Sequence, residues 1–252
     1  MRLASLNLLH GRSLVDGTVE LARLHAAVAE LAPDIVGLQE VDRDQPRSHS
    51  LDLTREVAGA LGAQHWRFVP ALIGEPGADW RASVAADGPG EPSYGIGLVS
   101  RFPVASWHVL RLPAAPVRSP VLLPGTKQLI WLQDEPRVGL AAVVETPLGT
   151  MTVATTHLSF VPVWNGVQLR RLTGWLAKLP GPCVLLGDLN MPPPLPRVLS
   201  GWRSLARVKT YPTTEPRIQL DHVLGHGDLP PVSSVAAPAL TVSDHRALVI
   251  EL

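Results

Sequence analysis

Apolar and polar residues alternate along this chain in a pattern that predicts strands and helices in succession. Residues 2–8 alternate as a short strand, and apolar positions at helical spacing predict a helix over 18–31, with Pro33 just beyond as a stop. The apolar run 35–38 predicts a second strand that leads into polar residues. The chain therefore opens with a strand, a helix and a strand.

The same mixture continues to the end of the chain. We expect a helix over 51–61, with Ser50 as its cap and Gly62 after its end. Residues 74–93 are rich in Gly, Pro, Ala and Asp without periodicity, which predicts a long loop that is a candidate for substrate contact. Further strands are predicted at 66–72, 95–100, 104–110, 127–133, 137–145, 150–156, 183–187, 218–224, 231–236 and 246–251, with a helix at 165–178.

This order of elements favours an α/β fold built from two sheets. Each sheet must bury both of its faces, which is achieved when two sheets pack together with helices on the outside. The 252 residues are 46% hydrophobic, enough for a large core, and no charge block or long polar tract divides them. We therefore expect one domain, residues 1–252, with an α/β sandwich architecture.

The charge balance argues against tight binding of nucleic acid through a global basic field. The 22 Lys and Arg residues match the 22 Asp and Glu residues, although a local basic groove is compatible with this balance. The lone Cys183 cannot form an intrachain disulfide, which fits a reducing compartment. The apolar run at the N-terminus is too short for a signal peptide, and no stretch of about 18 apolar residues spans a bilayer. These features predict a cytoplasmic protein without stable membrane insertion.

Polar side chains follow the predicted strands at several points. They are Asn7, Glu40, His157, Asp188 with Asn190, Asp221, and Asp244 with His245. Taken singly, Asn7 could be a turn former, Glu40 could begin a solvated polar run, and His157 could be hydrogen-bonded at a sheet edge. Asp221 is harder to explain, because a carboxylate in an apolar strand needs a partner or a metal.

Together these side chains predict a particular chemistry. Asn7, Glu40 and Asp244 offer the hard oxygen ligands that Mg²⁺ or Mn²⁺ prefers, and no Cys-rich or His-rich cluster indicates structural zinc. A divalent ion over a phosphate neutralises developing charge, while Asp188 or His245 can position and deprotonate a water. The combination predicts hydrolysis of a phosphoester.

Seven short motifs stand along the chain in a fixed order. They are Leu6-Asn7, Gly37-Leu38-Gln39-Glu40-Val41-Asp42, the ten residues from Tyr94 to Pro103, Thr156-His157-Leu158, Gly187-Asp188-Leu189-Asn190, Leu220-Asp221-His222-Val223 and Ser243-Asp244-His245. In this order they closely resemble the motifs of the endonuclease/exonuclease/phosphatase superfamily, which has the deoxyribonuclease-I-like fold. The resemblance covers nearly the whole chain.

The resemblance implies a four-layer αββα sandwich of two mixed sheets, with the site at one end of the packed sheets. It implies Glu40 as the principal metal ligand, with Asn7 beside it and Asp244 close to the metal or its waters. The implied metal is Mg²⁺, with Mn²⁺ as a substitute. Tyr94 would donate a hydrogen bond to the phosphate or the leaving group.

The remaining roles follow from the same resemblance. His245 would act as general base or phosphate-stabilising group, with Asp221 as its carboxylate partner. Asp188 would orient or activate the attacking water, and Asn190 and His157 would hold phosphate oxygens. Whether Asp188 or His245 takes the proton stays open at this point.

Departures from the patterns of individual subfamilies bear on the substrate. Apurinic endonucleases follow the metal-binding Glu with Thr-Lys, whereas this chain has Val41-Asp42, as in sphingomyelinase-like, deadenylase-like and many unassigned bacterial members. The export signal and membrane-engaging hairpin of secreted sphingomyelinases are not evident. We therefore expect a phosphodiesterase with a nucleic acid or nucleotide substrate, and the alternative is a phosphomonoesterase or a lipid or inositol-phosphate phosphoesterase.

A more distant alternative is a non-catalytic binding protein on the same fold, which would lack part of the site, and this chain lacks none of it. The segment 159–165 carries aromatic residues that could line a pocket or pack as a loop before the next helix. Arg137 is interpreted as part of a surface turn with a local ion pair and is left out of the site. No protein partner is implied, and we expect a monomer.

Overall fold

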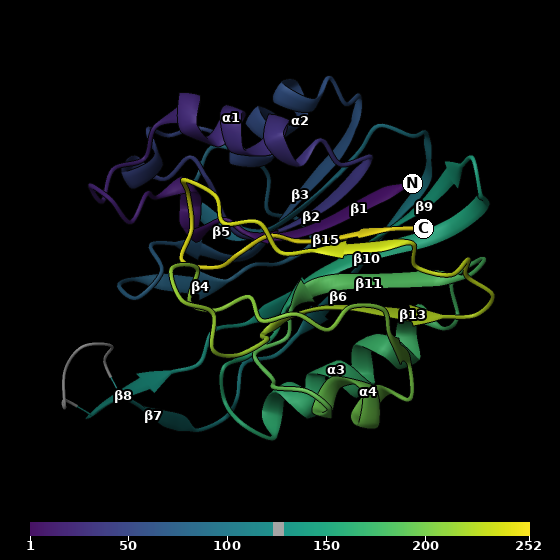
Figure 1. The fold of residues 1–252 in the computed structure, drawn as a ribbon. Helices are drawn as coiled ribbons and strands as arrows, with labels where there is room; N and C mark the ends of the chain where they lie inside the picture. The colour runs from purple at the N-terminus through teal and green to yellow at the C-terminus, as the bar shows by residue number, and fades with distance from the viewer. Residues whose placement is uncertain (123–128) are drawn as a thin grey trace.

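Two sheets pack face to face between two layers of helices (Figure 1). The computed structural model describes residues 1–122 and 129–252. In spatial order the first sheet contains β14 (Ser234–Ala236), β15 (Leu248–Glu251), β1 (Arg2–Asn7), β2 (Ile35–Arg43), β5 (Ser93–Ser100), β3 (His65–Gly74) and β4 (Trp80–Ala82). The second contains β12 (Arg203–Ser204), β13 (Asp221–His226), β11 (Cys183–Asp188), β10 (Gly149–His157), β9 (Arg137–Thr146) and β6 (Val104–Leu112).

The helices lie on the outer faces of the two sheets. Helices α1 (Leu21–Leu31) and α2 (Leu53–Leu61) cover the first sheet, and α3 (Trp164–Leu176) and α4 (Leu195–Ser200) cover the second (Figure 1). Single 3₁₀ turns, η1 (Leu9–Gly11) and η2 (Pro46–Ser48), follow β1 and β2. The predicted αββα sandwich is confirmed.

Three apolar clusters hold these layers together. The largest lies between the sheets and includes Leu3, Ile35, Leu98, Leu140, Val153 and Leu186, all fully buried. A second joins the first sheet to α1 and α2, and a third joins the second sheet to α3. Since burying one such side chain contributes about 1.5–3 kcal/mol, the interface between the sheets is a large share of the stability.

Each sheet contains one pair of parallel strands joined by a helix. β1 pairs in parallel with β2 across α1, and β10 pairs in parallel with β11 across α3. Parallel strands end at the same edge of a sheet, so the residues that follow them become neighbours. Asn7 is level with Gln39, and His157 is level with Asp188. The polar residues at the predicted strand ends are thereby brought to one end of the sandwich.

Most predicted elements are present, with shifted ends. α1 begins at Leu21 rather than at residue 18, and the strands predicted from 218, 231 and 246 begin at 221, 234 and 248. Residue 218 is excluded from the strand because its backbone pairs with Tyr211 in an isolated bridge. The cap of α2 is Asp52, whose carboxylate accepts from the backbone N–H of Arg55 at 3.1 Å, so Ser50 as a cap is wrong. Gly62 ends that helix in the left-handed conformation, as predicted.

Several short elements were not predicted. The segment 74–93 contains β4, which pairs with the end of β3, and α4 and β12 follow the prolines after Asn190. β7 (Arg118–Leu122) and β8 (Leu129–Gln133) form a hairpin that projects from the sandwich (Figure 1). β8 lies within the predicted strand 127–133, whereas β7 is not evident from the sequence, because Pro120 within it interrupts the strand pattern. Residues 127 and 128 of the predicted strand 127–133 lie outside the described residues.

Among the described residues, no helix is both long enough and apolar enough to cross a bilayer.

Candidate active site

A cleft of about 610 Å³ opens where the two sheets present the ends of their parallel strands. Seven of the nine predicted site residues line it, namely Glu40, Tyr94, His157, Asp188, Asn190, Asp244 and His245. The other two, Asn7 and Asp221, are fully buried beneath the cleft. Every side chain that the sequence singled out thus lies in this cleft or directly behind it.

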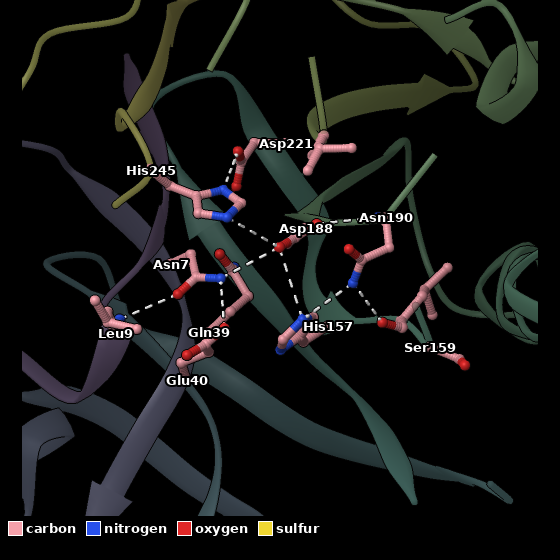
Figure 2. A network of polar contacts seen from close by, with 12 residues as sticks. Asn7, Leu9, Gln39, Glu40, His157, Ser159, Asp188, Asn190, Asp221 and His245 are labelled. Carbon is pink, nitrogen blue, oxygen red and sulfur yellow. Dashed lines mark hydrogen bonds and ion pairs between the residues drawn. The ribbon is translucent and has the colours of Figure 1, made fainter. Parts of the chain in front are cut away.

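Asn7 joins the two sheets at the floor of the cleft. Its side-chain Nδ2 donates to Glu40 Oε1 at 3.0 Å and to Asp188 Oδ2 at 3.2 Å, while its Oδ1 accepts from the backbone N–H of Leu9 at 3.1 Å (Figure 2). One amide therefore links a carboxylate on β2 to a carboxylate on β11. The bond from Leu9 is the local turn contact that the turn-former interpretation predicts, but that interpretation does not account for the bonds across the sheets.

An irregularity in β2 sets the direction of the Glu40 side chain. The pairing of β2 with β5 shifts register between Leu38 and Val41, and Glu40 has φ of 53°, in the left-handed region. The residues that follow are not solvated, because Val41 and Asp42 are fully buried and Asp42 accepts two hydrogen bonds of 2.8 Å from Arg47. The solvated-run alternative for Glu40 is wrong. Burial raises the pKa of the Glu40 carboxyl, an effect that the hydrogen bond from Asn7 opposes.

Asp221, His245 and Asp188 form a chain of charged groups. His245 Nδ1 donates to Asp221 Oδ2 at 2.8 Å, and His245 Nε2 lies 3.7 Å from Asp188 Oδ2 (Figure 2). Burial opposes the charged imidazole, but Asp221, Asp188 and Asp244 outweigh it and raise the pKa of His245 to about 10. Burial raises the pKa of Asp188 to about 7, against the attraction of His245. The neighbouring carboxylates thus favour the charged imidazolium of His245, while burial disfavours the charged form of Asp188.

The segment after β11 holds Asp188 and Asn190 in place. A Cβ at Gly187 would collide with the backbone carbonyl of Thr156, so only glycine allows β10 to approach here. Asn190 donates through its backbone N–H to Asp188 Oδ1 at 3.0 Å, and through Nδ2 to His157 Nε2 at 3.2 Å. Its carbonyl accepts from Asn165 Nδ2 at 2.9 Å. Side chains from β10 and α3 therefore help to fix this turn, in addition to the prolines after it.

The donor set fits a hard divalent cation. Asp244 Oδ1 and Asp221 Oδ1 are buried and have no hydrogen-bond partner in the described chain, and Asp244 lines the cleft together with Glu40. Asp188, Asp221 and His245 also offer ligand atoms within 4.8 Å of one another. Oxygen-rich donors with unsatisfied lone pairs suit Mg²⁺ or Mn²⁺. Asn7 faces Glu40 and Asp188 with its amide nitrogen, which donates hydrogen bonds, while its oxygen accepts from the backbone N–H of Leu9.

The model of the Endonuclease/Exonuclease/phosphatase family matches residues 4–245. The chain belongs to this family. Members of the family hydrolyse phosphate esters and generally use divalent metals. Among curated proteins, none matches the sequence.

Solved structures of this family share the fold. The endonuclease/exonuclease/phosphatase from Beutenbergia cavernae is 23% identical with a TM-score of 0.70, covering 99% of this chain and 70% of its own. A family protein from Leptotrichia buccalis is 13% identical with a TM-score of 0.66, covering 100% and 99%. The mannosyl-6-phosphatase of Bacteroides thetaiotaomicron is 16% identical with a TM-score of 0.59, covering 100% and 98%. At these identities the likeness establishes the fold.

Arg137 is the main correction to the predicted site of this family member. It is buried, with 5% of its surface exposed, and it lines the cleft. Its Nη1 lies 3.4 Å from His157 Nδ1, and its Nη2 lies 3.8 Å from Asp134 Oδ1 and 3.9 Å from Glu135 Oε2. The surface-turn interpretation is wrong, because β9 begins at Arg137 and lies beside β10, which ends at His157. Burial, together with Arg137, keeps the pKa of His157 well below its usual value.

Aromatic residues complete the cleft of the endonuclease/exonuclease/phosphatase domain. The Tyr211 ring lies 4.8 Å from the His245 ring, and Trp80 lines the cleft from the segment expected to contact substrate. Phe160 lines it from the segment 159–165, as one interpretation of that segment predicted. Tyr211 has no local sequence signal, because only the pairing of its loop with residue 218 brings it to the site.

Proposed function

We propose that this protein is a divalent-metal-dependent phosphodiesterase that cleaves its substrate by in-line attack of a water, with a nucleic acid or nucleotide as the favoured substrate. The observation that carries the proposal is the continuous network from Asp221 through His245 and Asp188 to Asn7 and Glu40. A binding protein that had lost catalysis would have no reason to retain all of it.

Glu40 and Asp244 would hold the cation, and Asn7 would join them if its amide oxygen turned from Leu9 toward the cleft. When bound, Mg²⁺ would neutralise charge on the phosphate oxygens as it develops. Asp188 would orient the water and accept its proton, because burial raises the pKa of its carboxyl and Asn7 and Asn190 fix both of its oxygens. This assigns the proton to Asp188 rather than to His245.

His245 would stabilise the anionic phosphate as an imidazolium held by Asp221. Arg137, His157 and Asn190 lie together at the cleft and would hold its non-bridging oxygens. Tyr94, also on the cleft wall, would donate its hydroxyl to the phosphate or the leaving oxygen. These groups are positioned before substrate arrives, so little reorganisation is needed during reaction.

The test uses bis(4-nitrophenyl) phosphate with Mg²⁺, with Mn²⁺ and with chelator. We expect turnover that chelator abolishes and Mg²⁺ restores, and a loss of about 10²–10⁴-fold in kcat for Asp188→Asn. Asp228→Asn, at an exposed turn, is the matched control and should keep wild-type rates. Wild-type turnover by Asp188→Asn would sink the assignment.

A phosphomonoesterase is the second candidate. The cleft volume of about 610 Å³ is large enough for one small phosphate ester. The mannosyl-6-phosphatase with the same fold is named for a monoester substrate. However, Glu40, Glu135, Asp188 and Asp244 line the cleft, so it is not the basic pocket that a dianionic monoester favours. A substrate panel with mannose 6-phosphate, inositol phosphates and sphingomyelin beside DNA and RNA decides between the classes.

Sphingomyelin belongs in that panel because the β7–β8 hairpin presents apolar side chains beside the cleft. Trp131 is 62% exposed, and Leu132 lines the cleft. A monomeric state, the absence of a protein partner and a cytoplasmic location stay predictions.

A further inference from the structure

A second hollow lies beside the catalytic cleft. It consists of two adjoining grooves of about 290 and 330 Å³ that share Pro193, Arg207 and Gln219 in their walls. Arg197 completes one groove, and Lys209 and Arg217 complete the other. We call the combined hollow the basic groove. None of its residues belongs to the catalytic network.

The basic groove concentrates cations in a chain that is neutral overall. The segment 192–219 contains Arg197, Arg203, Arg207, Lys209 and Arg217, but its only acidic residue is Glu215. Arg217 pairs with Glu215 at 2.8 Å, whereas Arg197, Arg207 and Lys209 are exposed and form no ion pair with any carboxylate in residues 1–122 and 129–252. Unpaired cations along one groove create a local positive potential that attracts an anion.

The floor of the basic groove is fixed by buried hydrogen bonds. His222 Nε2 donates to the carbonyl of Met191 at 2.8 Å, and Gln219 Nε2 donates to the carbonyls of Ala206 at 3.2 Å and Asp221 at 3.1 Å. These bonds tie the groove to β13 and to the turn that carries Asn190. The groove is thus pre-formed on the same rigid elements as the site.

The basic groove begins close to the cleft. Leu220 lines the cleft while its neighbour Gln219 lines the groove, and Asn190 lines the cleft while Pro193 lines the groove. Three residues of extended chain span at most about 11 Å, so the two hollows are separated by no more than a few nucleotides of a polymer. An extended anion therefore needs to span only this short distance to reach both hollows.

The walls of the groove also select the kind of anion. Pro193, Pro194 and Pro196 add apolar surface to the groove that Arg197 and Arg207 also line. Proline rings can pack against the faces of bases, and guanidinium groups can pair with phosphates, but in a duplex the base faces are stacked inside. We propose that the basic groove binds the phosphates and bases of a single-stranded nucleic acid whose scissile phosphate lies in the cleft. This inference rests on the proposed phosphodiesterase function and makes its substrate a polymer.

The test compares a polymer with a small diester. Arg207→Gln combined with Lys209→Gln should raise KM for a single-stranded 12-mer by about 10-fold and lower the slope of log affinity against log salt by about 1.4, for two lost phosphate contacts. The kcat of this double variant for the 12-mer should stay within twofold of wild type. Its kcat and KM for bis(4-nitrophenyl) phosphate should do the same. The matched control is Arg55→Gln combined with Arg67→Gln, two exposed arginines on α2 and β3.

The affinity of a fluorescent 12-mer, measured by anisotropy without turnover, separates this inference from the proposed function. If the groove variant binds the 12-mer about 10-fold more weakly than wild type, the basic groove is supported as the binding site. This holds even if no diester is hydrolysed, because the absence of hydrolysis would overturn only the proposed function. Equal binding of the 12-mer by the groove variant and wild type would overturn the proposal that the basic groove binds single-stranded nucleic acid. So would tighter binding to duplex, or binding to anionic vesicles with none to the 12-mer.

Discussion

Arg137 shows how much one side chain contributes to the character of the cleft. It is a buried cation in a wall otherwise rich in carboxylates, and its contacts with Asp134 and Glu135 are long, at 3.8 and 3.9 Å. A guanidinium that is desolvated but loosely paired retains donors for a phosphate. We expect Arg137→Met to lower kcat/KM by about 10²–10³-fold, the scale of one lost transition-state donor.

Arg137→Lys should recover only part of that loss, because a lysine offers a point charge instead of a planar fork. Thermal melting of each variant reports any cost of leaving Asp134 buried beside a missing cation. Activity that is unchanged in Arg137→Met, with the fold intact, would remove Arg137 from the phosphate site.

Cys183 leads to a different prediction at the same scale. It is buried on β11, and burial raises the pKa of its thiol to about 12. At pH 8 only about one molecule in 10⁴ would carry the reactive thiolate. We expect no alkylation by iodoacetamide in native buffer over several hours, as followed by mass spectrometry, and complete alkylation in guanidinium chloride. Stoichiometric labelling of the native protein would contradict this burial.

The site residues differ in how far the sequence reveals them. Asp221 is recognisable because a carboxylate inside an apolar strand needs a partner, and the structure supplies His245. Arg137 is not recognisable, since Asp134 and Glu135 beside it suggest a local ion pair. The deciding fact is that β9 and β10 pair as a hairpin whose open end places Arg137 beside His157, and the local charge pattern does not show this. Tyr211 is not recognisable either, because its place in the cleft depends on how its loop pairs with residue 218.

At the scale of elements, the close approach of β2 to the second sheet is a requirement of the site. A Cβ at Gly37 would lie 2.7 Å from Thr155 Oγ1 and 2.8 Å from Thr155 Cβ. We expect Gly37→Ala to lower the free energy of unfolding by about 1–3 kcal/mol, because overpacking pushes the sheets apart. Chemical denaturation measures this change in the free energy of unfolding. Activity should fall as well, since Asn7 and Asp188 must meet across this interface.

Gly59 provides the control for Gly37. It lies inside α2, and nothing is within 4 Å of a Cβ added there. Gly59→Ala should therefore raise the free energy of unfolding by about 0.5–1 kcal/mol through helix propensity. If Gly37→Ala and Gly59→Ala change the free energy of unfolding in the same direction, the contact of Gly37 with Thr155 does not explain the effect at Gly37.

Elements with long apolar patterns could be predicted from the sequence, and short edge elements could not. β10 and β11 are runs of buried residues, and their predicted ranges differ from the observed ones by one residue at each changed end. β4 and β12 have three and two residues, too few to show a period. The cap of α2 was misplaced because Ser50 and Asp52 are both favourable cap residues, and only the backbone path decides between them.

At the scale of the whole molecule, folding brings acidic groups from distant parts of the chain into one cleft. Glu40, Asp188 and Asp244 line it, and Asp221 lies beneath. His245 and Arg137 balance only part of the repulsion among these carboxylates. This repulsion is absent from the unfolded chain, because the same groups are far apart there. The folded state therefore gains more than the unfolded state from a divalent cation.

Mg²⁺ should stabilise the fold by mass action. At a free concentration 100 times the dissociation constant, a ligand of the native state adds about 2.7 kcal/mol, and at about 2–4 °C per kcal/mol the Tm should rise by about 5–10 °C. Chelator should reverse the shift in differential scanning fluorimetry. Glu40→Gln removes one charge of the cluster, so without metal its Tm should equal or exceed that of wild type, and its shift with Mg²⁺ should nearly vanish. An equal Mg²⁺ shift in Glu40→Gln would place the cation elsewhere, most directly at Asp188, Asp221 and His245, whose ligand atoms also lie within reach of one ion.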